Sequence, residues 1–172
     1  LVPTYYVLTT AEASSNRARF DGINFGYRSK NASDLESTYK KSRSEGFGEE
    51  VKRRIMLGTF VLSSGYYDAY YSKAQKVRRL IQNKINEILK NYQFIILPST
   101  PGTAFKFGQK NNDPIAMYLE DIFTVLANIS GNPAISIPTG KHSNGLPFGI
   151  QVIANNFDEA ELFSVSKQIM NL

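Results

Sequence analysis

Apolar residues recur at steps of three and four along much of the chain, the spacing that places them on one side of a helix. The clearest such segment runs from residue 66 to about residue 89, where Lys and Arg mostly occupy the opposite side. The same spacing predicts further helices over about 3–17, 35–46, 49–62, 115–129 and 159–170. The segment 115–129, with Asp113 as its predicted N-cap, is apolar nearly all round and is therefore expected to be buried.

Three short segments have the features of strands. Residues 94–98 form a continuous apolar run that ends at Pro98, which is typical of a strand buried on both faces. Residues 134–138 and 148–153 flank Asn144-Gly145, a strong turn signal, and predict an antiparallel pair. Because a long helix leads directly into the first of these strands, we predict the α/β fold class.

The composition is that of one globular domain: of 172 residues, 42% are hydrophobic and 20% are charged. The absence of cysteine excludes disulfides, thiolate metal sites and a cysteine nucleophile, and the single histidine, His142, excludes a multi-histidine zinc site. We therefore predict no metal site. No apolar stretch reaches the ~20 residues of a membrane span, and the lack of cysteine is compatible with a reducing cytoplasm, so we expect a cytoplasmic protein.

Two features of the whole chain leave alternatives open. The formal charge of +5 suits an acidic partner such as RNA, although basic domains without such a partner are common. The chain begins at Leu1, without Met and already inside an apolar run, and we interpret it as a protein entered in the middle.

Asp121 is the most informative candidate residue. In the predicted helix, Met117 and Val125 lie four residues to either side of it, so the carboxylate is expected on an apolar face. A buried carboxylate is costly unless it is paired or accepts hydrogen bonds. Asp121 is therefore expected either to form a structural ion pair or cap, or to bind a substrate.

Arg54 is the second candidate. Glu49 with Arg53, and Glu50 with Arg54, have the i,i+4 spacing of helix-surface ion pairs, worth only ~0.2–0.5 kcal/mol each. A solvated ion-pair face is the simpler interpretation of this pattern. Arg54 also lies at the edge of the apolar side, from which a guanidinium could hold a carboxylate through two hydrogen bonds.

Other reactive side chains have simpler interpretations. His142 lies in a turn-like segment and is expected at the surface, and Ser14, Ser15, Ser63 and Ser64 fit helix breaks and caps better than nucleophiles. The loop 98–103, which follows the first strand, is a candidate for ligand binding by its position alone, because ligands of open α/β sheets collect beyond strand ends.

Several segments together resemble the C-terminal part of the amidase signature family, and within it the glutamine-hydrolysing subunits of bacterial tRNA-dependent amidotransferases. They are residues 5–8, 11–16, 19–22, 43–59, 64–71, 97–101 and 145–151. The resemblance covers essentially the whole chain. It implies the C-terminal portion of an α/β/α sandwich with a mixed sheet, and it implies that residues 1–172 are a single C-terminal fragment of an amidase domain.

The resemblance also implies a function. A protein of this kind hydrolyses glutamine to ammonia, which a partner subunit uses with ATP and Mg to convert Glu-tRNA(Gln) into Gln-tRNA(Gln). The family performs the hydrolysis with a Ser, cis-Ser, Lys triad that nothing in this chain matches, so no catalytic residue is assigned and the isolated chain is expected to be inactive. The implied partners are subunits B and C, with tRNA bound through the complex rather than directly.

Three residues fall where the family's subunit holds glutamine. The resemblance assigns Arg54 to the substrate carboxylate, Asp121 to its ammonium group, and Tyr5 to the pocket lining. The sequence departs from the family at Leu126, where Pro is usual, and at Asn132, where Leu is usual.

Two other functions are alternatives to this one. One is a general amidase of the same family. The other is a non-enzymatic module whose basic residues bind RNA, and its candidate contacts are Lys40, Lys41, Lys52, Arg53, Arg78 and Arg79.

Overall fold

The computed structural model describes residues 1–109 and 114–171, so the predicted N-cap Asp113 lies outside the described residues. The chain falls into two compact units, which are described separately. The helical unit consists of residues 6–75, and the sheet unit consists of residues 1–5 and 76–171. Among the described residues, no helix combines the length and the apolar character needed to cross a membrane.

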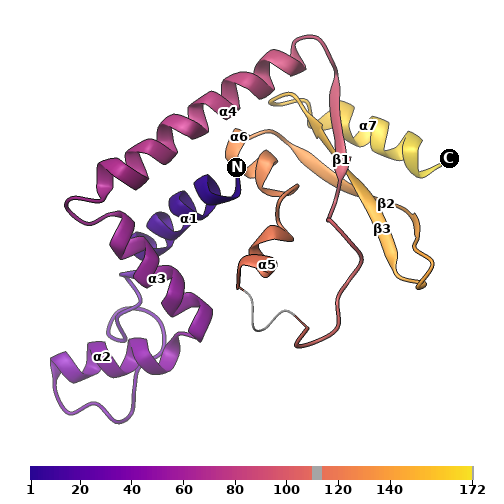
Figure 1. Ribbon diagram of the computed structural model, residues 1–172. Helices are drawn as coiled ribbons and strands as arrows, with labels where there is room; N and C mark the ends of the chain where they lie inside the picture. The colour runs from indigo at the N-terminus through magenta and orange to yellow at the C-terminus, as the bar shows by residue number, and fades with distance from the viewer. Residues whose placement is uncertain (110–113, 172) are drawn as a thin grey trace. The chain divides into compact units, whose positions relative to one another are not determined.

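The helical unit contains most of α1 (Val2–Arg17), then α2 (Leu35–Gly46), α3 (Glu49–Val61), the π-helix η1 (Tyr67–Ser72) and the first residues of α4 (Lys73–Leu89) (Figure 1). The predicted helices over 3–17, 35–46 and 49–62 are confirmed. The predicted helix over 66–89 differs at its start, because its first turn is a π-helix. Gly65, in the predicted break before it, has a φ of 86°, a conformation that favours glycine.

A capping box begins α2. The backbone N–H of Ser37 donates to Asp34 Oδ1 at 2.8 Å, and the Ser37 hydroxyl accepts from the Asp34 backbone N–H at 3.0 Å. Two donors that the helix itself cannot satisfy are thereby bonded. The predicted choice between Ser33 and Asp34 as the cap is settled in favour of Asp34.

Within the helical unit, α1 and α3 approach each other closely at Gly58. A Cβ atom added to Gly58 would lie 2.0 Å from the Thr10 carbonyl oxygen and 2.6 Å from Ser14 Cβ. Beside this contact the hydroxyls of Ser14 and Thr59 are hydrogen-bonded at 3.0 Å. The absence of a side chain at Gly58 is therefore what lets the two helices pack.

The sheet unit contains three antiparallel strands in the order β1-β3-β2: β1 (Phe94–Pro98), β2 (Ala134–Lys141) and β3 (Pro147–Ala154). The predicted antiparallel pair is confirmed, and Gly145 in its turn has a φ of 80°. The prediction that residues 94–98 are buried on both faces is wrong. Within the described residues, β1 pairs only with β3, so it is an edge strand, and Ile96 is 56% exposed.

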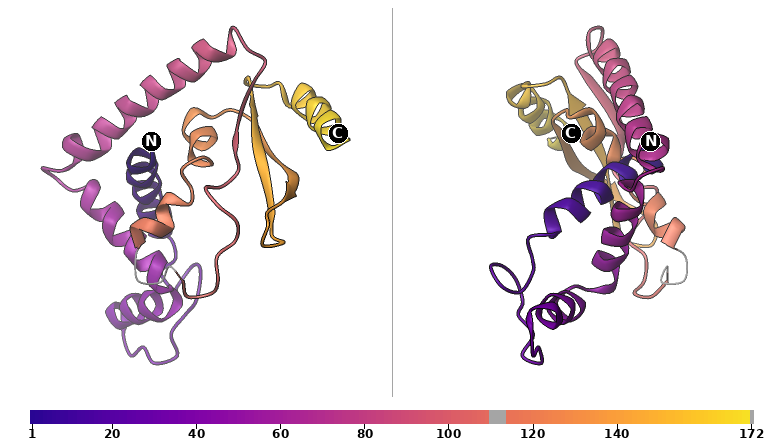
Figure 2. Two further views of the ribbon diagram at one scale, coloured as in Figure 1. Left: turned by 45° about the vertical axis from the view of Figure 1, so that its right-hand side comes forward. Right: turned by 90° about the vertical axis from the view of Figure 1, so that its left-hand side faces the viewer.

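The core of this unit lies between the sheet and α7 (Glu159–Met170), where Ile137, Val152, Ala154 and Leu162 are buried together. Figure 2 shows the strands between α7 and the part of α4 after residue 76. On the other face of β3, Ile153 and Gln151 are also buried. Helices on both faces of a sheet give the α/β class that the sequence predicts.

The predicted buried helix over 115–129 is wrong in length and in burial. It consists of two short helices, α5 (Pro114–Leu119) and α6 (Val125–Ser130), joined by a turn. Val125 and Ile129 of α6 are buried, whereas Ile115 of α5 is 69% exposed. Gly131, with a φ of 84°, ends α6 as predicted, and the side chains of Arg78 and Gln82 on α4 donate to the last carbonyls of α6.

Candidate functional site

Arg54 lies half-buried on α3, where two groups of the helical unit hold its guanidinium. Its Nε donates to Glu50 Oε1 at 2.9 Å, and its Cζ lies 5.7 Å from the centre of the Tyr6 ring. Tyr6 is only 8% exposed, so the ring provides a fixed surface under the cation. The predicted Glu50–Arg54 pair is therefore present, and the guanidinium has a defined orientation.

Glu50 is shared between two arginines. Its Oε2 pairs with Arg53, which is more exposed than Arg54, while Glu49 pairs with Lys52 at 3.6 Å. Partial burial alone would raise the pKa of the Glu50 carboxyl, but the hydrogen bond and charge of Arg54 and the charge of Arg53 outweigh it and lower the pKa below its usual value. Glu50 therefore stays ionised and keeps Arg54 in place near neutral pH.

Asp121 does not lie on a buried helix face, contrary to the prediction. It lies in the turn between α5 and α6 and is exposed. Its backbone carbonyl accepts from the Val125 N–H at 3.0 Å and from the Thr124 hydroxyl at 3.1 Å, so the turn that carries it is bonded to the start of α6. An exposed carboxylate on a bonded turn needs no buried partner and is accessible to a ligand.

Tyr5 lies on α1 and is half-buried. It and Asp121 belong to the sheet unit, whereas Arg54 belongs to the helical unit. Neither unit by itself contains all three residues that the resemblance assigns to glutamine. The sequence did not single out Tyr6 as a contact of Arg54, and its only signal was its place beside Tyr5.

The two departures from the family pattern have ordinary structural places. Leu126 is half-buried on α6. Asn132 is buried, and its Nδ2 donates to the Ala154 carbonyl at 3.0 Å, which joins the start of β2 to the end of β3. Asn132 therefore has a bonding role that Leu could not fill.

A polar pocket of about 440 Å³ lies between α6 and the sheet, lined by Thr124, Ala127, Asn128, Gly131, Asn132, Ala134 and Gln151. Asn132 Oδ1 and Gln151 Oε1 are buried and have no hydrogen-bond partner among the described residues. Two buried acceptors without donors are unusual, because each costs free energy when it is removed from water. None of the residues assigned to glutamine lines this pocket.

The loop after β1 continues the strand briefly and then turns. The Ser99 N–H donates to the Gly149 carbonyl at 3.1 Å, and Asn144 Nδ2 donates to the Thr103 hydroxyl at 3.1 Å. His142 lies in the β2–β3 turn, where it is exposed, as predicted. The loop is therefore fixed to the hairpin, and it brings no base to any of its hydroxyls in the described residues.

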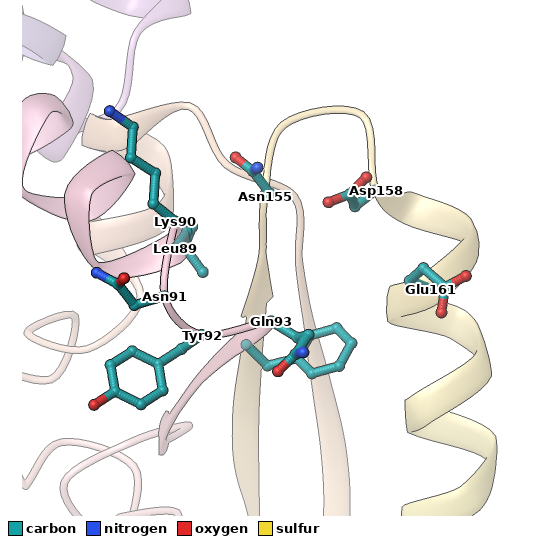
Figure 3. Close-up of a pocket in the computed structure, with 9 residues that line it drawn as sticks. Leu89, Lys90, Asn91, Tyr92, Gln93, Asn155, Asp158 and Glu161 are labelled. Carbon is teal, nitrogen blue, oxygen red and sulfur yellow. The ribbon is translucent and has the colours of Figure 1, made fainter.

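A second pocket, of about 320 Å³, lies at the end of the sheet where α4 leads into β1 and β3 leads into α7 (Figure 3). Asp158 and Glu161 on the first turns of α7 provide its carboxylates, and Lys90 and Tyr92 are directed away from α7. Among the described residues, no group of three His, Cys, Asp or Glu side chains could hold a metal ion. The pocket offers polar contacts but no nucleophile.

Known proteins that match the chain give this geometry a context. Residues 1–163 match the model of a family described as Amidase. Relatives named as the A component of glutamyl-tRNA(Gln) amidotransferase include the protein of Oceanobacillus iheyensis, 59% identical over 160 residues, and that of Pelagibacter ubique, 58% identical over 165 residues. These matches cover 93% and 96% of this chain but 33% and 34% of the relatives, so the chain spans about a third of their length.

Solved structures match over the same extent. The protein of the same name from Thermotoga maritima is 37% identical, with a TM-score of 0.56, and the match covers 94% of this chain and 36% of that chain. A crystal structure described as amidase is 17% identical, with a TM-score of 0.69, and the match covers 95% of this chain and 33% of that chain. The second likeness concerns the fold alone, and the predicted amidase-type α/β fold is confirmed.

Proposed function

Because the chain belongs to the amidase family, we propose that it is part of the glutamine-hydrolysing subunit of a glutamyl-tRNA(Gln) amidotransferase. The observation that carries this proposal is the 55–59% identity to relatives of that name over at least 93% of the chain. Since the chain spans about a third of those relatives, the reaction belongs to a longer protein.

In this proposal the chain supplies part of the glutamine pocket. Glutamine carries one carboxylate and one ammonium group, so its pocket needs a cation and an anion at a fixed separation. Arg54, oriented by Glu50 and Tyr6, would hold the carboxylate, and the exposed Asp121 would hold the ammonium group. Tyr5 would line the pocket between them.

The rest of the reaction depends on other parts of the complex. The Ser, cis-Ser, Lys triad would come from a part of the subunit outside this chain, so the isolated chain would be inactive. Subunits B and C would complete the assembly, and ATP and Mg would activate the tRNA-linked glutamate at a partner subunit. Residues 1–172 would then be one C-terminal fragment of an amidase domain acting in the cytoplasm.

The pocket assignment is tested by comparing Arg54→Ala with Arg53→Ala in the full-length protein, in complex with its partners. Both arginines pair with Glu50, but only Arg54 contacts Tyr6. Loss of a charge-assisted contact should raise the KM for glutamine about 10- to 100-fold in Arg54→Ala. Arg53→Ala should leave it within about twofold, as expected for an exposed ion pair.

Activity with ammonium chloride as the nitrogen donor is the internal control, because it bypasses glutamine hydrolysis. It should be unchanged in both variants. An unchanged KM for glutamine in Arg54→Ala would remove Arg54 from the site. A general amidase of the same family would instead purify without partner subunits and would hydrolyse other amides.

A further inference from the structure

The helical unit contains a third pocket, of about 260 Å³, which none of the residues assigned to glutamine lines. It lies between α1, the end of α3 and η1, and its lining consists of Ala11, Glu12, Ser15, Asn16, Leu62, Tyr67 and Tyr71. All seven residues belong to the helical unit. The pocket is therefore defined without reference to the sheet unit.

Two tyrosines of the π-helix form the aromatic side of this pocket. The ring centres of Tyr67 and Tyr71 lie 5.1 Å apart at an angle of 40°. The hydroxyl of Tyr71 accepts from Gln75 Nε2 at 3.1 Å, which fixes that ring. Tyr67 is 44% exposed, so part of its ring remains accessible. Aromatic faces carry partial negative charge and attract cations.

The opposite side of the pocket is polar and carries one charge. Glu12 is exposed, and the hydrogen bond that its Oε2 accepts from Asn16 Nδ2 is long, at 3.5 Å. A bond of that length leaves the carboxylate able to accept stronger donors. Neither Lys nor Arg is among the lining residues, so the only formal charge in the lining is negative.

We propose that this pocket binds a guanidinium group. A guanidinium is planar, stacks on aromatic rings and donates in parallel to a carboxylate, so it matches the tyrosines and Glu12 at once. A neutral ligand would leave the Glu12 charge uncompensated, and an anion would be repelled by it. The site is independent of the glutamine pocket, so it stands or falls separately from the proposed function.

The test is an NMR titration of the chain with N-acetyl-arginine methylamide, followed through the signals of Tyr67 and Tyr71. The matched probe is the citrulline analogue, which has nearly the same shape without the charge. It should bind about tenfold more weakly, because it loses the ion pair and the cation–π contact. Free arginine is a second arm: tighter binding than the capped form identifies an amino acid ligand, and weaker binding identifies a side chain of a partner protein.

Three variants locate the site. Glu12→Gln should weaken binding of the arginine probe about fivefold and leave the citrulline probe unaffected. Tyr67→Phe keeps the ring and should keep the affinity, whereas Tyr67→Leu should lower it. Tyr70→Leu is the control, because Tyr70 is on the same π-helix but packs with Phe60 and Tyr66.

Equal affinity for the arginine and citrulline probes would overturn the proposal. So would an unchanged affinity in Glu12→Gln, a surface substitution that should not disturb folding. If Tyr70→Leu weakened binding as much as Tyr67→Leu, the pocket between α1 and η1 would not be the site.

Discussion

Gly58 shows how one missing side chain can decide a helix contact. Replacing it with alanine would favour the helical backbone by up to ~1 kcal/mol. The added Cβ would, however, lie 2.0 Å from the backbone oxygen of Thr10, which cannot rotate away. Because such overpacking costs about 1–3 kcal/mol, the clash outweighs the gain in propensity.

We therefore expect Gly58→Ala to lower the free energy of unfolding by about 1–2 kcal/mol. Chemical denaturation of the two variants measures this directly. Gly102→Ala is the matched control, since a Cβ at Gly102 would meet nothing within 4 Å. A Gly58→Ala chain as stable as the original would show that the helices separate at no cost.

Gln151 makes the opposite case, because its side chain has a polar atom without a partner. Its Oε1 is buried with no donor among the described residues. Gln151→Met preserves the shape and removes this acceptor, so it should raise the free energy of unfolding by about 1 kcal/mol. Thermal unfolding provides the comparison.

The matched control for Gln151→Met is Gln82→Met. Gln82 Nε2 donates to the Ser130 carbonyl at 3.3 Å, so its removal should reduce stability. If the two variants changed stability in the same direction, the missing donor at Gln151 would not be the cause.

At the scale of elements, the start of α2 depends on one ionised carboxylate. The pKa of Asp34 is lowered chiefly because the carboxylate accepts the backbone N–H of Ser37. The cap therefore contributes fully above the ordinary pKa of about 3.9 and is lost as the pH falls through the lower folded-state pKa.

The Ser37 amide signal should report this titration, with a midpoint below ~3.9. Asp34→Asn keeps an acceptor at the cap, so its Ser37 signal should lose the acid transition while α2 remains helical. A midpoint at or above the ordinary value would contradict the cap.

The elements also show where prediction from sequence ends. Apolar spacing correctly predicted α1, α2, α3 and α7, because each is a local pattern along one helix. The segment 115–129 misled, because Ile122, Phe123 and Thr124 have low helix propensity and a turn separates α5 from α6. Periodicity also cannot tell which face is covered, and so the predicted burial of Asp121 was wrong.

The candidate site divides in the same way. The Glu50–Arg54 pair could be predicted, since four residues separate two partners on one helix. The contact of Arg54 with Tyr6 could not, because it joins two helices far apart in sequence. The roles of Tyr5, Arg54 and Asp121 in glutamine binding rest on resemblance and stay predictions.

At the scale of the whole molecule, the sheet has open edges. Within the described residues, β1 and β2 each pair only with β3, and Ile96 on β1 is 56% exposed. Unpaired strand edges with apolar side chains promote association between chains. We therefore expect the isolated chain to self-associate with rising concentration.

A charge at the edge should oppose this. Ile96→Lys should shift sedimentation toward the monomer, whereas Phe163→Lys, on exposed α7, should have little effect. Equal effects of both variants would attribute association to general surface hydrophobicity instead. A chain that stays monomeric at all concentrations would contradict the expectation altogether.

The strand order also has a consequence in time. The hairpin of β2 and β3 closes over a short connection, but β1 finds its partner only when β3 exists, ~50 residues later in the chain. At a synthesis rate of about 5–20 residues per second, the ribosome needs about 3–10 seconds to make that stretch. During this interval the newly made Phe94–Pro98 segment has no strand to pair with, and it is then most in need of a chaperone.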